Sequence, residues 1–388
     1  MGTIYLDHAA TTPLRPEVAA AMAPFLQGLV GNPSSVHRWG RAARSALEDA
    51  RERTAALLRV RSDEIRFVRG GTESVNVAVL GRAAWLRERG DGEVVFLRSR
   101  LEHSAVRESM DAAGALGVRS ETFEVDASGR ADLPTARELS ARGVEFVSCQ
   151  WVNQETGMIL PVPDLARECN AAGVPLHVDA VQAAGRIPLE LDEHPIAMVS
   201  LSGHKLGGPR STGILVLRKG TELRPLMFGG GQERGLRPGT EDVAGAVGIA
   251  RALDLSLDTM EVESPRLADL RAWLEAGLVG AIPGTRVHAG GASRAPHILG
   301  LGIPDLPMDV LPGALDLEGI GASAGSACMS GSTEVSPTLR ALYGDDASGY
   351  APLRLSLGWT TSAEEVSEAL RKIPPIVERI RVSAGVTS

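Results

Sequence analysis

The chain has 388 residues, of which 44% are hydrophobic and 23% are charged, and its formal net charge is −8. This length suits two domains, and the acidic balance argues against a basic surface for nucleic acid or an anionic membrane. No apolar run approaches the roughly 20 residues of a membrane span, and the first residues lack the pattern of a signal peptide. We therefore expect a cytoplasmic globular protein that binds neither nucleic acid nor membrane.

A long helix is predicted over residues 37–60, because small and apolar residues recur there at helical spacing. Seven β-rich runs follow, with helical segments such as residues 72–90 and 133–143 between most of them. The runs are residues 64–70, 93–99, 120–125, 145–151, 175–181, 197–203 and 212–218. This alternation predicts a mostly parallel seven-stranded sheet covered on both faces. The last gap is too short for a crossover helix, so the last strand is expected to be antiparallel to its predecessor.

The pattern changes after about residue 251. Another helix is predicted over residues 264–282, and a Gly/Pro-rich stretch follows from Pro283 to Pro312. We interpret this part as a second, smaller domain that the N-terminal segment completes. The expected division is a large domain over residues 15–255 and a small domain formed by residues 1–14 and 256–388.

Glycine and threonine follow the first predicted strand, at Gly70, Gly71 and Thr72. Glycine lets a ligand approach the backbone closely, threonine can cap a helix, and the free amides of a helix start favour an anion. An ordinary turn and cap would explain the same residues. The segment is neither a Walker loop nor a GxGxxG motif, so a phosphate site is one of two interpretations here.

Polar side chains also lie where other predicted strands end, at His103, Asn153, Asp179 and Gln182. In a sheet of this kind, ligands bind beyond the carboxyl ends of the strands. A carboxylate at the end of an apolar strand needs a cation or several donors. Taken singly, a loop histidine, a turn asparagine and a capping aspartate would explain these residues as well.

Lys205 ends an apolar strand beside Ser202 and His204, where a lysine is costly unless it is paired, solvated or chemically used. Taken together, the polar residues at the strand ends match the requirements of pyridoxal phosphate. A lysine forms the Schiff base with its aldehyde, and an aspartate keeps its pyridine nitrogen protonated, so that the ring withdraws electrons. Asp179 lies one strand before Lys205, so adjacent strands would deliver both to one ring.

Nine motifs in one order resemble the NifS/IscS-type cysteine desulfurases, members of the class V aminotransferase group. They are "YLDHAATTP", "GNPSSVH", "GGTESVN", "EHSAV", "HVDAVQ", "SGHKLGGP", "GGGQERGLRPGT", "SAGSAC" and "LRLSLG", which extend over nearly the whole chain. The resemblance implies the α/β fold-type I of pyridoxal-phosphate-dependent transferases, with the seven-stranded sheet in a large domain and a smaller α+β domain. It also implies a homodimer that takes sulfur from L-cysteine.

The resemblance gives each matching residue a role. Lys205 would hold the cofactor and act as the base, Asp179 would pair with the pyridine nitrogen, and His103 would stack on the ring. The remaining expected cofactor contacts are Asn153 and Gln182 at the ring hydroxyl and Gly71, Thr72, Ser202, His204 and, from a second subunit, Thr240 at the phosphate. Asn32 and Arg354 would bind the substrate carboxylate, for which a guanidinium suits because it donates two parallel hydrogen bonds.

Three cysteines far apart in the sequence argue for a reduced protein without a disulfide framework. No Cys/His spacing suggests zinc, so no metal is expected. Cys149 falls in a predicted strand and Cys169 on a helix face, whereas Cys328 lies among small and polar residues, where an exposed thiol can meet a substrate and then a partner. The resemblance makes Cys328 the catalytic nucleophile that carries the sulfur as a persulfide. It also implies acceptor partners, such as iron–sulfur scaffold proteins or proteins of tRNA thiolation.

Two departures from the family pattern concern the polar shell of the expected site. Val68 and Arg69 stand where Thr-Ser is common, and Gln154 stands where a second asparagine is usual. Three other functions keep the same cofactor residues or part of them. A selenocysteine lyase would need Cys328 less, a class V aminotransferase would need a keto-acid acceptor, and a non-catalytic scaffold would only bind sulfur acceptors.

Overall fold

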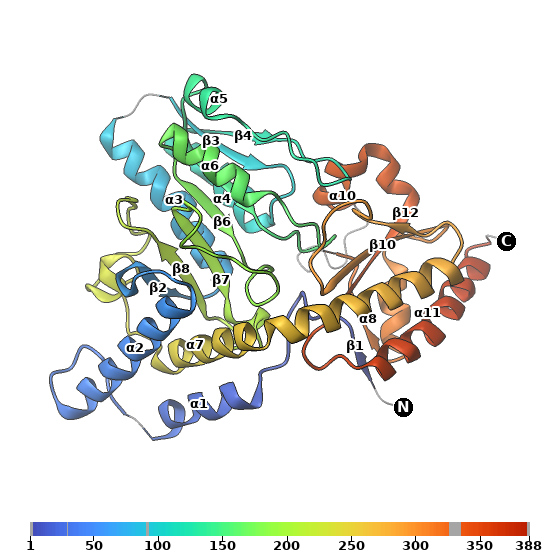
Figure 1. Ribbon diagram of the computed structural model, residues 1–388, viewed down its shortest axis with the longest axis horizontal. Coiled ribbons are helices and arrows are strands. Elements are labelled where there is room, and N and C mark those ends of the chain that lie inside the picture. The colour runs from blue at the N-terminus through green and yellow to red at the C-terminus, as the bar shows by residue number, and fades with distance from the viewer. Residues whose placement is uncertain (1–2, 29, 91–92, 326–334, 386–388) are drawn as a thin grey trace.

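The computed structural model describes residues 3–28, 30–90, 93–325 and 335–385. Its largest element is a seven-stranded sheet in the order β2-β8-β7-β6-β5-β3-β4 (Figure 1). The strands are β2 Ile65–Val68, β3 Val94–Ser99, β4 Val118–Phe123, β5 Val144–Gln150, β6 Leu176–Asp179, β7 Met198–Ser202 and β8 Gly213–Leu217. Each of the seven predicted β-rich runs contains or overlaps one of these strands, so the predicted strand count is confirmed.

The sheet is parallel except at β8, which pairs antiparallel with both β7 and β2. This confirms the expected direction of the last strand. Its cause is the short link from β7 to β8, in which Gly203 and Thr212 join by a backbone hydrogen bond of 2.8 Å. A link of this length reverses the chain, whereas a parallel crossover needs a helix.

Helices cover both faces of the sheet, and successive residues of β3 show why. Val95 and Leu97 pack in one apolar cluster, whereas Val94 and Phe96 pack in another on the opposite face. The helices of this part are α1 Pro16–Gln27, α2 Arg38–Leu57, α3 Gly71–Arg89, α4 Ser104–Ala113, α5 Ala136–Ala141, α6 Val162–Ala172 and α7 Val243–Asp258. α3 and α4 cover the second face of the sheet. Each follows a strand, β2 and β3 respectively, so both helices begin at the carboxyl edge of the sheet.

A second, smaller sheet has the order β12-β10-β9, all antiparallel (Figure 1). Its strands are β9 Arg286–Val287, β10 Ile298–Pro304 and β12 Tyr350–Ser356, and the helices of this part are α8 Met260–Ala281, α9 Val310–Leu317, α10 Pro337–Tyr343 and α11 Ala363–Ser383. Near the N-terminus, β1 Ile4–Tyr5 pairs in parallel with β11 Ile320–Gly321. Ile4 and Leu6 pack in the same apolar cluster as these C-terminal elements. The domain boundary near residue 255 stays a prediction.

Two predicted helices differ in their ends. The helix expected over residues 133–143 begins only at Ala136, because Thr135 caps it by accepting a hydrogen bond from the backbone of Glu138. The helix expected from residue 264 begins four residues earlier, at Met260, with Pro265 inside its first turns. Within the residues that the structure describes, none of the helices combines the length and apolar character that a membrane crossing requires.

Candidate active site

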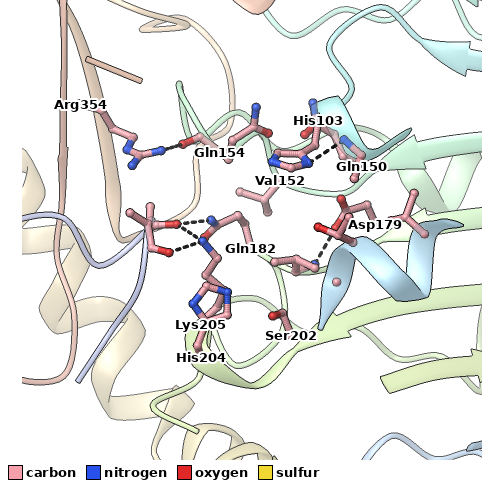
Figure 2. Close-up of a pocket in the computed structure, with 17 residues that line it drawn as sticks. His103, Gln150, Val152, Gln154, Asp179, Gln182, Ser202, His204, Lys205 and Arg354 are labelled. Atoms are coloured by element: carbon pink, nitrogen blue, oxygen red, sulfur yellow. Dashed lines mark hydrogen bonds between the residues drawn. The ribbon is translucent and has the colours of Figure 1, made fainter. Parts of the chain in front are cut away.

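A cavity of about 240 Å³ lies beyond the carboxyl ends of β5, β6 and β7 (Figure 2). Nine of the residues predicted from the sequence line it, namely Gly71, Thr72, His103, Asp179, Gln182, Ser202, His204, Lys205 and Arg354. Other residues that line it are Ala9, Ala10, Val75, Ala105, Gln150, Val152, Gln154 and Val181. The fold therefore gathers residues that are up to 345 positions apart in sequence, from Ala9 to Arg354, around one space.

Lys205 reaches this cavity from a single 3₁₀ turn, Gly203–Lys205, that follows β7 directly. Its Nζ donates hydrogen bonds to the carbonyl oxygens of Ala9 at 2.5 Å and Ala10 at 2.7 Å. Both carbonyls belong to the N-terminal segment between β1 and α1. Two backbone oxygens thus compensate a partly buried ammonium group that an apolar strand delivers.

Asp179 is the last residue of β6 and is only 8% exposed. Its Oδ1 accepts a hydrogen bond of 3.0 Å from the backbone N–H of Val181. Burial raises the pKa of this carboxyl group, and the charges of His103 and Lys205 act in the opposite direction. A cationic partner in the cavity would relieve the cost of ionising a carboxyl group in this place.

His103 caps the N-terminus of α4, and its Nδ1 accepts a hydrogen bond of 3.1 Å from the backbone N–H of Ala105. Burial lowers the pKa of the imidazole, and this effect outweighs the opposing effect of the nearby Asp179, while the charge of Lys205 acts in the same direction as burial. The ring is therefore neutral at pH 7, with its proton on Nε2, because Nδ1 is an acceptor. A neutral, flat and partly buried ring at the wall of the cavity suits stacking against an aromatic ligand.

The start of α3 forms part of the cavity wall through Gly71, Thr72 and Val75. A Cβ atom on Gly71 would lie 2.9 Å from Cγ2 of Val181, so only glycine fits without displacing that side chain. The backbone amides of a helix start, beside the buried hydroxyl of Ser202, form a cradle for an anion. This is the place where the sequence predicted a phosphate.

His204 also lines the cavity and shares a hydrogen bond of 3.1 Å with the hydroxyl of Thr11 through Nδ1. Burial lowers the pKa of His204 to about 4, helped by the neighbouring charges of Lys205 and Arg210. The imidazole is therefore neutral at pH 7 and can donate one hydrogen bond to an anion without carrying a charge.

Three predicted site residues do not line the cavity. The carboxamide oxygen of Asn153 accepts hydrogen bonds from the backbone of Glu155 at 3.0 Å and of Thr156 at 2.9 Å, which shapes the turn after β5. Asn32 is exposed and accepts from the backbone of Ser34, and Thr240 is exposed. Cys328 lies outside the described residues. The roles of these four residues stay predictions, as do the roles assigned to the nine residues that line the cavity.

Sequence reasoning assigned no role to several residues at the cavity. Gln154, noted only as a departure from the family pattern, and Gln150 both line it. Glu102, the neighbour of His103, is fully buried and accepts hydrogen bonds from Ser99 Oγ at 2.5 Å and from the backbone of Gln150 at 2.8 Å. Burial raises the pKa of Glu102 to about 8. Its sequence signal was a carboxylate inside "EHSAV", three residues after the end of a predicted apolar strand.

The donor set fits pyridoxal phosphate. A lysine amine is available for the aldehyde, a buried carboxyl group for the ring nitrogen, a neutral imidazole for the ring face and an amide cradle for the phosphate. These groups lie in the parallel α/β sheet with the spacing that adjacent strands impose. The fold and the site together define a pyridoxal-phosphate-dependent enzyme of fold-type I.

The chain belongs to the aminotransferase class-V family, whose sequence profile matches residues 4–369. It is 38% identical over 382 residues to the cysteine desulfurase NifS of Azotobacter vinelandii, covering 98% of this chain and 94% of that protein. It is 40% identical over 386 residues to a cysteine desulfurase of Bradyrhizobium diazoefficiens, covering 99% and 97%. A solved structure of a NifS-like protein superimposes with a TM-score of 0.88 at 32% identity, covering 97% of this chain and all of that chain.

Proposed function

We propose that the protein is a cysteine desulfurase that converts L-cysteine to L-alanine and keeps the sulfur as a persulfide on Cys328. The thiol of Cys328 and L-cysteine react to give the Cys328 persulfide and L-alanine. The Cβ–S bond of the substrate breaks, an S–S bond forms, and Cβ gains a hydrogen, so no external oxidant or reductant is needed. The observation that carries the proposal is that Lys205 and Asp179 line one cavity, at the ends of the adjacent strands β7 and β6. The similar proteins of the same family are named cysteine desulfurases.

Each residue at the cavity then has a defined task. Lys205 holds the cofactor covalently, Asp179 faces its ring nitrogen and His103 stacks on its ring. Gly71, Thr72, Ser202 and His204 bind the phosphate. Gln182 faces the ring oxygen, and Asn153 is the second proposed contact to this oxygen. Pyridoxal phosphate, when bound, supplies a ring that withdraws electrons from the substrate Cα. Lys205 Nζ removes the Cα proton, because no other described residue that lines the cavity carries a side-chain amine.

The substrate carboxylate binds at Arg354, whose side chain is only 3% exposed and borders the cavity. A guanidinium selects an amino acid by its carboxylate, because its planar fork can donate two parallel hydrogen bonds to the two carboxylate oxygens. Asn32 is the second proposed contact to this carboxylate.

Cys328 is the proposed nucleophile, and the two other cysteines argue for it by their burial. Cys149 and Cys169 are 1% and 0% exposed, and burial raises the pKa of each thiol. Such thiols neither ionise at neutral pH nor meet a substrate. On either side of residues 326–334, Gly325 lies beside the carboxylate of Glu155, and Ser336 Oγ donates a hydrogen bond of 2.6 Å to it. Glu155 follows Gln154 of the cavity wall, so both flanks of this segment lie near the site.

The proposal includes a homodimer and protein partners. Three consecutive apolar side chains are exposed to solvent, those of Leu226, Met227 and Phe228, and Phe228 is 90% exposed. Thr240, which is also exposed, follows twelve residues later. Consecutive exposed apolar side chains are typical of a protein interface. In the dimer, Thr240 reaches the phosphate site of the partner. The sulfur then passes to an acceptor or iron–sulfur scaffold protein in the cytoplasm.

The test is a comparison of the wild type with Cys328→Ser after incubation with L-cysteine, measuring alanine, sulfide and peptide-mapped persulfide. We expect the variant to bind the cofactor and cysteine as the wild type does, because neither step uses the thiol. Persulfide and alanine formation should collapse, since a serine hydroxyl stays protonated and attacks sulfur poorly. Cys149→Ser and Cys169→Ser are the matched controls. A persulfide only on Cys149 or Cys169, or alanine formation that requires an added keto acid, would refute the proposal.

A further inference from the structure

His297 does not line the cavity, but its side chain contacts Gln182, which does. It precedes β10 and is 2% exposed, and its backbone oxygen accepts a hydrogen bond of 2.8 Å from the N–H of Leu357. Its Nε2 lies 3.3 Å from Oε1 of Gln182, which lines the cavity. The smaller sheet thus touches the site of the larger one through this pair.

The contacts of Gln182 fix which way round its carboxamide lies. Its Nε2 donates a hydrogen bond of 2.8 Å to the carbonyl oxygen of Ala9, and a carbonyl oxygen can only accept. The nitrogen therefore faces Ala9 and the oxygen Oε1 faces His297. Since Oε1 also only accepts, Nε2 of His297 carries the proton, and Nδ1, which has no partner among the described residues, is the bare nitrogen.

The surroundings of His297 keep this tautomer neutral. Burial lowers its pKa well below 6.5, and the charges of Arg186, His8, Arg271 and Arg354 act in the same direction. No acidic group is among the charges that act on it most strongly. The imidazole is therefore a fixed single donor toward Gln182 across the neutral pH range.

We propose that His297 is a positioning residue that locks the carboxamide of Gln182 so that its second N–H points into the cavity, toward the ring oxygen of pyridoxal phosphate. This inference rests on the cofactor site of the proposed function. One N–H of the Gln182 carboxamide donates to the carbonyl oxygen of Ala9. With the carboxamide held in this orientation, the second N–H can donate to the cofactor. If the carboxamide turned over, its oxygen would face the ring oxygen, and two acceptors would repel each other.

The experiment uses the matched substitutions His297→Asn and His297→Gln. Both are neutral amides, but only the longer glutamine places an N–H where Nε2 of histidine lies. The readout is the absorbance of the cofactor-loaded protein without substrate, titrated with pH to find where the nitrogen that links Lys205 to the cofactor loses its proton. A donor to the ring oxygen favours the deprotonated form, in which the negative charge is concentrated on that oxygen.

We expect His297→Asn to raise the midpoint of this titration by about 0.5 to 1 pH unit, the equivalent of one lost hydrogen bond. His297→Gln should return it to the wild-type value. Gln182→Leu should raise the midpoint by itself, and adding His297→Asn to it should have no further effect, because the histidine acts only through Gln182.

An unchanged midpoint in His297→Asn, or an effect that adds to that of Gln182→Leu, would overturn the inference. Circular dichroism and thermal unfolding of the cofactor-free proteins check that the variants fold. If His297→Asn does not fold, His297→Leu takes its place with the same expected shift. A wild type that binds no cofactor would refute the proposed function instead, whereas a normal wild type with unshifted variants refutes only the role of His297.

Discussion

The guanidinium of Arg354 is held between the carboxylate of Asp7, at 2.8 Å, and the backbone oxygen of Gln154, at 3.0 Å. The three residues come from the start, the middle and the end of the chain, and Gln154 and Arg354 both line the cavity (Figure 2). Two acceptors orient the side chain, while Nε has no partner among the described residues. The cation is therefore fixed in place before a substrate carboxylate arrives, which lowers the ordering cost of binding.

The first prediction follows from this arrangement. Arg354→Lys should raise the KM for L-cysteine roughly 10- to 100-fold, because a charged hydrogen bond contributes about 1.5–3 kcal/mol and lysine cannot reproduce the planar fork. Asp7→Asn, which keeps an acceptor but loses the charge, should raise KM less. Arg379→Lys, on an exposed arginine that pairs with Glu318, is the control. Steady-state kinetics with wild-type KM in Arg354→Lys would remove Arg354 from the substrate site.

The second prediction concerns Lys205. Lys205→Ala should abolish the yellow absorbance of the covalently held cofactor, because no other amine of the cavity residues can replace its Nζ. Lys219→Ala changes an exposed lysine on the loop after β8 and should leave the spectrum unchanged. The measurement is the visible spectrum after loading and gel filtration. A covalent cofactor that persists in Lys205→Ala would show that the wrong lysine has been assigned.

The polar residues at the strand ends were predictable because their position follows from the fold class. Alternating strands and helices imply a parallel sheet, and a parallel sheet gathers the carboxyl ends of its strands along one edge. Asp179 and Lys205 therefore had to lie close together once β6 and β7 were recognised as neighbours. The contacts of the N-terminal segment with Lys205 could not be predicted in this way. Ala9 and Ala10 accept hydrogen bonds through their backbone carbonyl oxygens, which every residue has.

The strands of the smaller sheet could not be located in the sequence, for a different reason. β10 lies inside the Gly/Pro-rich stretch from Pro283 to Pro312, which is assigned to the smaller domain from the sequence without any strand being located in it. A Cβ atom on Gly300 would lie 2.6 Å from the carbonyl oxygen of Glu155, so this glycine permits a close approach rather than a turn. Sequence composition cannot distinguish these two uses of glycine. Recognition of His297 as a neighbour of Gln182 depended on the same strand, and it therefore required the structure.

The third prediction tests the proposed dimer. Phe228→Asp places a charge where an exposed phenyl ring would be buried on association, and burying an unpaired charge is costly. We expect the wild type to sediment as a dimer and Phe228→Asp to shift toward the monomer, with weaker cofactor binding if Thr240 completes the phosphate site of the partner. Val382→Asp alters an exposed valine at the end of α11 and is the control. A fully active wild-type monomer would contradict the shared site.

The fourth prediction is a pH dependence of stability that Glu102 causes. Burial raises the pKa of Glu102 to about 8 in the folded protein, against an ordinary value of 4.5. Between these two pH values, the folded state holds a proton that the unfolded state has lost. The free energy of unfolding therefore falls as the pH rises, by about 3 kcal/mol between pH 5 and pH 8 from this group alone.

Glu102→Gln keeps the shape of the protonated side chain and cannot ionise, so it should remove this contribution. We expect the variant to gain thermal stability relative to the wild type at pH 8, and to gain little at pH 5, when the cofactor-free proteins are compared by melting temperature. Glu124→Gln, at an exposed carboxylate that pairs with Arg100, should show no such dependence on pH. The raised pKa of Asp179 acts in all three proteins, so the difference between Glu102→Gln and the wild type isolates Glu102. An equal difference in melting temperature at both pH values would mean that Glu102 is ionised in the fold, and that the site holds a second buried negative charge beside Asp179.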